Sequence, residues 1–224
     1  MMLRQLRIEN FRGVRQCDWR IDKRFTALVG PGDSAKTTLL DAIGLVLSPS
    51  YNPAFSDADF YGLDPANQIV IEAVVTDLPD RLVREDQLGR ERAGLMPDGT
   101  LVHDPLDEAD ECLVIRLSVT SELEPLWEVR RPGSDDSRSI NASQRRRLGF
   151  FRLGERPDYH LRWARGSALS SLTESNGDAA SLILDAHRAA RSQAFGADPD
   201  VLHMAADRVA EATRTMGSVD FDGL

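Results

Sequence analysis

The hydrophobic pattern at the N-terminal end of the chain predicts two strands, a tight turn and a helix. Apolar residues punctuate a charged, strand-like stretch over residues 3–11. Residues 25–29 form a short apolar run, which is typical of a strand buried on both faces. Apolar residues then recur at helical spacing over residues 37–47, and Pro49 prevents the helix from continuing.

The rest of the chain predicts strands first and helices afterwards. Apolar runs predict three further strands: residues 69–75, 112–119 and 126–130. Helical periodicity, caps and terminators predict three helices: residues 80–88, 177–194 and 199–216. An acidic loop follows the first of these helices, and residues 131–143 are expected to form a polar turn.

Composition restricts the class of protein. The 224 residues are 42% hydrophobic and carry a net charge of −9, which indicates a folded core and argues against coating nucleic acid over the whole surface. Cys17 and Cys112 lie in no metal or redox spacing, so a reduced, cytoplasmic setting is expected. No apolar run approaches the roughly 20 residues that span a bilayer, so no membrane partner is expected. Only Lys23 and Lys36 are lysines among 27 basic residues.

Lys36 belongs to the strongest chemical motif of the chain. Nine residues between the predicted strand and helix approximate the phosphate-binding P-loop: Gly30, Pro31, Gly32, Asp33, Ser34, Ala35, Lys36, Thr37 and Thr38. Such a loop turns successive backbone N–H groups toward phosphate oxygens. The motif therefore predicts binding of ATP with Mg²⁺.

Two residues of this loop carry the predicted catalytic chemistry. Lys36 is expected to neutralise the β- and γ-phosphates, and the Thr37 hydroxyl is expected to hold Mg²⁺. Ala35 departs from the motif, which has glycine at that position. A Cβ there crowds the loop or shifts its dihedral angles, so the effect on affinity stays open.

Residues 6–13, the loop and residues 39–43 together resemble the opening of an ABC-type ATPase head. More narrowly, they resemble the RecF/SMC-like group and the OLD-family ATP-dependent endonucleases, which share an I-x-N-F-[RK] strand and an L-[LI]-[DE]-A-I helix. Residues 56–61 are similar to the acidic-aromatic segment that OLD-type proteins carry after that helix. The resemblance is specific over residues 3–62.

The resemblance implies a mechanism and a partner. Two heads, as a homodimer or higher oligomer, sandwich ATP, and hydrolysis is coupled to work on DNA. By analogy, Arg12 lies near the phosphates or at the contact between heads. OLD-type chains add a Toprim nuclease domain. Neither a Walker B strand nor a signature motif is recognisable, so the chain is expected to be the N-terminal half of such a head, with low turnover by itself.

Two other clusters have competing interpretations. Asp57 and Asp59 match the Asp-x-Asp of a Toprim metal site, but a loop or helix-capping role is favoured because they follow no buried strand. The Arg145–Arg165 window holds seven arginines interleaved with aromatic residues, as a DNA-contacting surface would. A role for these arginines in lining the nucleotide cleft or pairing with the acidic surface, with the aromatic residues in the core, is favoured over DNA contact.

The sequence therefore predicts an α/β fold: a P-loop ABC-type ATPase half-head with an antiparallel β segment and a C-terminal helical segment. Residues 1–165 form the expected ATP-binding lobe, with the P-loop at 30–38, and residues 166–224 the helical segment. Two alternatives stay open. One is a scaffold or regulatory subunit whose degenerate P-loop has lost nucleotide turnover. The other is a P-loop kinase or GTPase, although no lid or base-reading motif is present.

Overall fold

The computed structural model divides the chain into two compact units, residues 1–152 and 153–224. It describes these residues: 1–32, 34–47, 49, 53–80, 82–84, 88–105, 107–134, 137–152, 167, 185–186 and 188–189. Nearly all of them belong to the first unit. In the predicted helix 177–194, the four described residues are helical. The predicted helix 199–216 lies outside the described residues, and the boundary expected at residue 165 stays a prediction.

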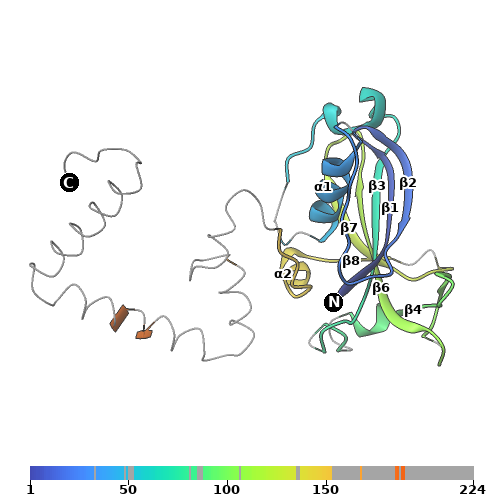
Figure 1. Ribbon diagram of the computed structural model, residues 1–224, viewed down its shortest axis with the longest axis vertical. Coiled ribbons are helices and arrows are strands. Elements are labelled where there is room, and N and C mark those ends of the chain that lie inside the picture. The colour runs from blue at the N-terminus through green and yellow to red at the C-terminus, as the bar shows by residue number, and fades with distance from the viewer. Residues whose placement is uncertain are drawn as a thin grey trace, which may run out of the picture. The chain divides into compact units, whose positions relative to one another are not determined.

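An antiparallel β-sheet forms the body of the first unit (Figure 1). Its strands are β1 (Met2–Phe11), β2 (Val14–Arg20), β3 (Ile69–Thr76), β4 (Ala93–Leu95), β5 (Leu101–Val102), β6 (Asp110–Val119), β7 (Pro125–Arg130) and β8 (Ser137–Ser139). The strand order is β2-β1-β3-β6-β4-β5, with β7 paired to β6 and β8 paired to β7. Every strand pairing in the described part of the chain is antiparallel.

Few helices accompany the sheet. They are α1 (Lys36–Leu47), α2 (Ala142–Arg146) and three single 3₁₀ turns, η1 (Asp57–Asp59), η2 (Tyr61–Leu63) and η3 (Gly89–Glu91). Figure 1 shows α1 lying along one face of the sheet. Within the described residues, no helix combines the length and apolarity needed to cross a membrane.

The core lies between α1 and the inner face of the sheet. Alternate residues of the central strands are fully buried there, including Ile8 of β1, Ile71 of β3 and Ile115 of β6. On the opposite face, cross-strand register places Arg7 beside Glu72, and Glu72 beside Arg116. Opposite charges in direct cross-strand positions stabilise a sheet, so the period-2 pattern sets both the core and the outer face.

The structure confirms the predicted strands 3–11, 69–75, 112–119 and 126–130, and the helix 37–47. Strand β2 was not predicted, although Cys17, Trp19 and Ile21 alternate with polar residues and carry a strand signal. It is an edge strand paired only with β1 among the described strands. Its exposed polar face kept the apolar content of the segment low.

The predicted buried strand at residues 25–29 is wrong. The segment is extended but belongs to no strand, and the side chains of Phe25 and Val29 are 85% and 93% exposed. A strand buried on both faces needs neighbours on both edges, and no described strand pairs with this segment. The described unit is consequently a mostly antiparallel sheet with few helices, rather than an α/β layer built around this strand.

Two further local predictions need correction. The first concerns the predicted helix 80–88, where the described residues form turns and bends. The backbone turns there so that Leu82 and Leu88 are both buried, and the Leu88 N–H bonds to the Leu82 carbonyl at 3.1 Å. The expected polar turn 131–143 contains β8 and the start of α2 instead. Asn141 caps α2, since its side chain accepts from the backbone N–H of Gln144 at 3.0 Å.

Candidate phosphate-binding site

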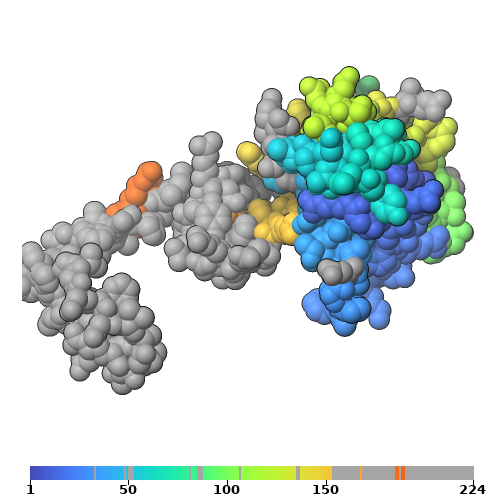
Figure 2. Space-filling view, turned by 90° about the horizontal axis from the view of Figure 1, so that it is seen from above, coloured from blue at the N-terminus to red at the C-terminus, as the bar shows by residue number. Residues whose placement is uncertain are grey.

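The predicted P-loop leads directly into helix α1, which begins at Lys36. The Lys36 ammonium folds back over the loop: Nζ donates to the Gly30 carbonyl and to Ser34 Oγ, each at 2.9 Å, and to the Pro31 carbonyl. Ser34 Oγ in turn donates to the Pro31 carbonyl at 2.8 Å. Figure 2 shows the blue atoms of this region at the lower edge of the first unit. The lysine therefore gathers the acceptors of the loop around one positive charge at an exposed surface.

Backbone conformation explains the small residues of the loop. Ala35 has φ 58°, in the left-handed region that favours glycine, and its carbonyl accepts the first bond of the helix from Leu39 at 2.9 Å. A Cβ built on Gly30 would come within 2.9 Å of Ser34 Oγ, so a larger residue there would require the Ser34 side chain to shift. Gly32 has open space around it. Asp33 lies outside the described residues.

The two threonines occupy the first turn of α1. Thr37 is exposed and Thr38 is half-buried. The first turn of a helix presents unpaired N–H groups and a positive dipole end, which favours an anion. With Lys36 and a hydroxyl beside them, these groups fit a nucleotide phosphate and its Mg²⁺.

The described residues contain no group of three or more His, Cys, Asp or Glu that could hold a metal ion by itself. Mg²⁺ in phosphate sites is usually held by one or two protein oxygens together with the phosphates. The Thr37 hydroxyl is the predicted protein ligand, and that role stays a prediction.

Arg12 lies beside α1, held by two carboxylates. Its Nε donates to Oδ1 of Asp59 at 2.9 Å, and its Nη1 pairs with Oδ2 of Asp41. The backbone N–H of Arg12 also bonds to the Asp59 carbonyl at 2.7 Å. Burial opposes the charge on Arg12, but the bonds to Asp59 and Asp41 outweigh that effect and raise the pKa of Arg12. The guanidinium is therefore fixed at the P-loop helix.

The Asp57–Asp59 segment has the loop and capping role that was favoured from the sequence. It forms the 3₁₀ turn η1, in which Oδ2 of Asp59 accepts from the Ser56 N–H at 3.1 Å. Next to it, Phe60 pairs with Phe11 of β1, and both rings are fully buried. The acidic-aromatic segment thus attaches the loop after α1 to the end of β1.

Asp41 was not singled out as a site residue from the sequence, and Arg152 was considered only as part of the Arg145–Arg165 window. Asp41 accepts from both arginines, with Arg152 Nη1 lying 2.6 Å from its Oδ1. The usable signal for Asp41 was its spacing, four residues after Thr37 on the same helical face. No local signal connects Arg152 to it.

Two of the described arginines of the 145–165 window, Arg145 and Arg152, make side-chain contacts within the first unit. Arg145 is 3% exposed, stacks over Trp127 with 3.8 Å to the ring centroid, and donates to the Ile140 carbonyl at 3.0 Å. Burial lowers its pKa. Arg145 is therefore unavailable to DNA, and Arg152 is paired with Asp41. The window's residues from 153 to 165 lie outside the described part of the chain.

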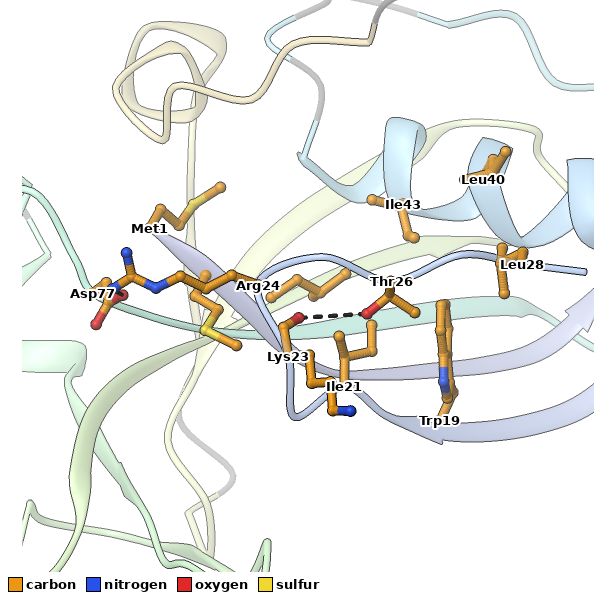
Figure 3. Close-up of a pocket in the computed structure, with 12 residues that line it drawn as sticks. Met1, Trp19, Ile21, Lys23, Arg24, Thr26, Leu28, Leu40, Ile43 and Asp77 are labelled. Atoms are coloured by element: carbon orange, nitrogen blue, oxygen red, sulfur yellow. Dashed lines mark hydrogen bonds and ion pairs between the residues drawn. The ribbon is translucent and has the colours of Figure 1, made fainter.

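A cavity of about 630 Å³ lies beside the segment that was predicted as a buried strand. Figure 3 shows Ile43 of α1 above it, Trp19 of β2 and Ile21, which follows β2, below it, and the segment carrying Leu28 between them. None of the P-loop residues lines it. It is thus separate from the candidate phosphate site.

Comparison with known proteins supports an ATPase at the N-terminal end. Residues 1–93 match the family model of the AAA ATPase domain. A 46-residue stretch, 20% of this chain, is 44% identical to the DNA replication and repair protein RecF of two Vibrio cholerae serotype O1 strains. That stretch spans only 13% of the length of these curated relatives. The family match covers fewer than half of the 224 residues, so both likenesses apply to part of the chain.

A structural comparison gives a more distant likeness. A solved structure described under the heading of ATP-driven dimerization and DNA-stimulated activation of SMC ATPases is similar at a TM-score of 0.41. The identity is 20%, over 65% of this chain and 75% of that one. The matches reported above include no OLD-family protein and no nuclease, so those finer assignments stay predictions.

Proposed function

We propose that this chain binds ATP with Mg²⁺ as the N-terminal part of an ABC-type ATPase head. One observation carries the proposal: a loop of P-loop spacing enters α1 with the Lys36 ammonium gathered onto its acceptors. Backbone N–H groups of the loop and first turn would bind phosphate oxygens, and Lys36 would neutralise them. The Thr37 hydroxyl would orient the Mg²⁺ that accompanies the nucleotide.

The two lysines of the chain allow a matched test. Lys36→Ala removes the proposed phosphate contact, whereas Lys23→Ala removes the same charge from an exposed turn. Titration calorimetry with ATP–Mg²⁺ should show binding to the wild type and to Lys23→Ala. Lys36→Ala should bind at least about tenfold more weakly, since a hydrogen-bonded charge contributes about 1.5–3 kcal/mol. Equal affinities for the two variants would refute the proposal.

The finer function is DNA processing or phage defence by an OLD/RecF-like ATPase. The RecF match, to a protein of DNA replication and repair, supports the DNA-related part. Hydrolysis would require the C-terminal half of the head and a second head as dimer partner. Nuclease activity would require a Toprim domain in a longer chain. ATP turnover measured with and without DNA, on this chain and on a longer one, tests these statements together.

Ala35 favours a second candidate, a scaffold whose degenerate P-loop has lost nucleotide. A side chain at φ 58° replaces the glycine of the motif. A ligand that binds only the folded state at 100 times its Kd stabilises it by about 2.7 kcal/mol. Thermal unfolding with saturating ATP–Mg²⁺ therefore separates the two candidates: a higher Tm supports the ATPase head, and an unchanged Tm supports the scaffold.

A further inference from the structure

We propose that Asp41 and Asp59 form a carboxylate clamp that presents Arg12 to the phosphates of the bound nucleotide. In this arrangement Asp41 and Asp59 are positioning residues, and Arg12 supplies a second cation beside Lys36. The inference rests on the proposed function, because it assigns a role at the same site. It adds the two acids and the way in which they direct the arginine.

The clamp lies beside the first turns of α1. Asp41 follows Thr37 by four residues in α1, so the two side chains share a face of the helix. Four residues span about 6 Å along a helix axis. Since Arg12 pairs with Asp41, its guanidinium lies about one helical turn from the predicted Mg²⁺ ligand. An arginine side chain is long enough to cover that separation.

The Arg12 guanidinium has more hydrogen-bond donors than the two carboxylates use. A guanidinium has five N–H donors in a planar fork. The two carboxylates engage Nε and Nη1, and the two N–H groups of Nη2 remain for another acceptor. The side chain of Arg12 is 39% exposed, against 16% for Asp41 and 15% for Asp59. The carboxylates therefore hold the inner part of the guanidinium while its outer part reaches the surface.

Both carboxylates of the clamp are themselves held in place by other groups. The second oxygen of Asp59 accepts from Ser56 N and Oγ at 3.1 and 3.3 Å. The second oxygen of Asp41 pairs with Arg152. Arg12 also has φ 48°, a conformation that costs a non-glycine residue free energy and that the Asp59 carbonyl bond maintains. Such a preorganised cation is suited to binding an anion rather than to pairing alone.

Neutralising Asp59 has opposite expected effects on ATP affinity under the clamp and under simple electrostatics. Removing an acidic charge near a nucleotide should tighten binding of its phosphates. If Asp59 positions Arg12, neutralising it should weaken binding instead. Asp59 accepts from Arg12 on one carboxylate oxygen and from Ser56 on the other. Asn at position 59 replaces one of these oxygens with an NH₂ donor, so one of the two contacts is lost. Asp59→Asn therefore separates the two effects.

Calorimetric titration of the full chain with ATP–Mg²⁺ is the test, with Asp57→Asn as the matched control. Asp57 lies in the same 3₁₀ turn and is exposed, and no contact of its side chain with Arg12 is present. Asp59→Asn should bind ATP about tenfold more weakly than wild type, as expected for loss of a charged contact. Asp57→Asn should stay within about twofold. An Asp59→Asn affinity equal to or tighter than that of Asp57→Asn overturns the clamp.

Two further variants exclude a purely structural effect. Ser56→Ala removes the hydroxyl contact to Asp59 but leaves the backbone N–H contact and the bond of Asp59 to Arg12, so it should lower Tm slightly without changing ATP affinity. In an Arg12→Ala background, Asp59→Asn should not weaken affinity further, and loss of the negative charge should leave it equal or slightly tighter; a persisting tenfold loss would overturn the clamp. If the wild type itself does not bind ATP, the proposed function fails. If it binds and only the Asp59→Asn result fails, the clamp alone is wrong.

Discussion

Ala35→Gly should stabilise this protein, although Ala→Gly substitutions within helices usually destabilise. Ala35 precedes the first residue of α1 and has φ 58°. The Cβ of an L-residue is crowded by the carbonyl oxygen in that region, whereas glycine adopts it freely. Glycine is also preferred to alanine at the position before a helix.

The expected magnitude is a difference of two terms. Relief of the left-handed conformation contributes about 1–2 kcal/mol. The greater backbone entropy of glycine in the unfolded chain opposes it by about 0.5–1 kcal/mol. The free energy of unfolding should therefore rise by about 0.5–1 kcal/mol. For a chain of this size, that corresponds to a Tm increase of about 2 °C.

Thermal and urea unfolding of three variants tests the reasoning. Ala42→Gly is the matched control, because Ala42 is fully buried within α1 and has ordinary helical surroundings. It should lose about 2 kcal/mol from helix propensity and the buried methyl group. Ala35→Val should be less stable than wild type, since a β-branched residue tolerates positive φ poorly. A decrease in Tm for Ala35→Gly would refute the assigned backbone strain.

Three further predictions concern the first unit. Gly44→Ala should raise the free energy of unfolding by about 0.5–1 kcal/mol in urea titration, because the added Cβ would meet Arg152 atoms at 3.6 and 3.8 Å, which is ordinary contact. Trp127→Phe should lower the free energy of unfolding by about 2 kcal/mol, because it loses the 3.2 Å bond from Nε1 to the Leu45 carbonyl and some core volume. Leu126→Ala is the control: this residue is 47% exposed, so the free energy of unfolding should change little. Burial raises the pKa of Cys112 from 9.0 to about 12. Between these two values the folded state keeps a thiol proton that the unfolded chain releases. The free energy of unfolding should therefore fall as pH rises from 9 toward 12. Cys112→Ala should show a shallower fall in pH-dependent urea unfolding, and identical slopes would contradict the assignment.

Local patterns were enough to predict the helix that follows the candidate phosphate loop and most strands of the sheet, but not the segment before the loop. The helix 37–47 and the strands of the central sheet follow from apolar periodicity, because one face of each packs into a single core. The P-loop was located from the spacing of Gly30 and Lys36 between an apolar run and a helix. These are relations between residues close in the chain.

Only the tertiary structure decided which distant side chains meet. Arg12 finds Asp41 and Asp59 at separations of 29 and 47 residues, and no periodicity reports such a pairing. Arg145 looked like part of a cationic surface, but packing against Trp127 buries it. Conversely, residues 25–29 have the composition of a buried strand and are exposed, because burial requires partner strands that a local pattern does not supply. The sequence by itself thus determined most of the sheet, the helix 37–47 and the position of the candidate phosphate loop, whereas long-range pairing decided the surroundings of Arg12.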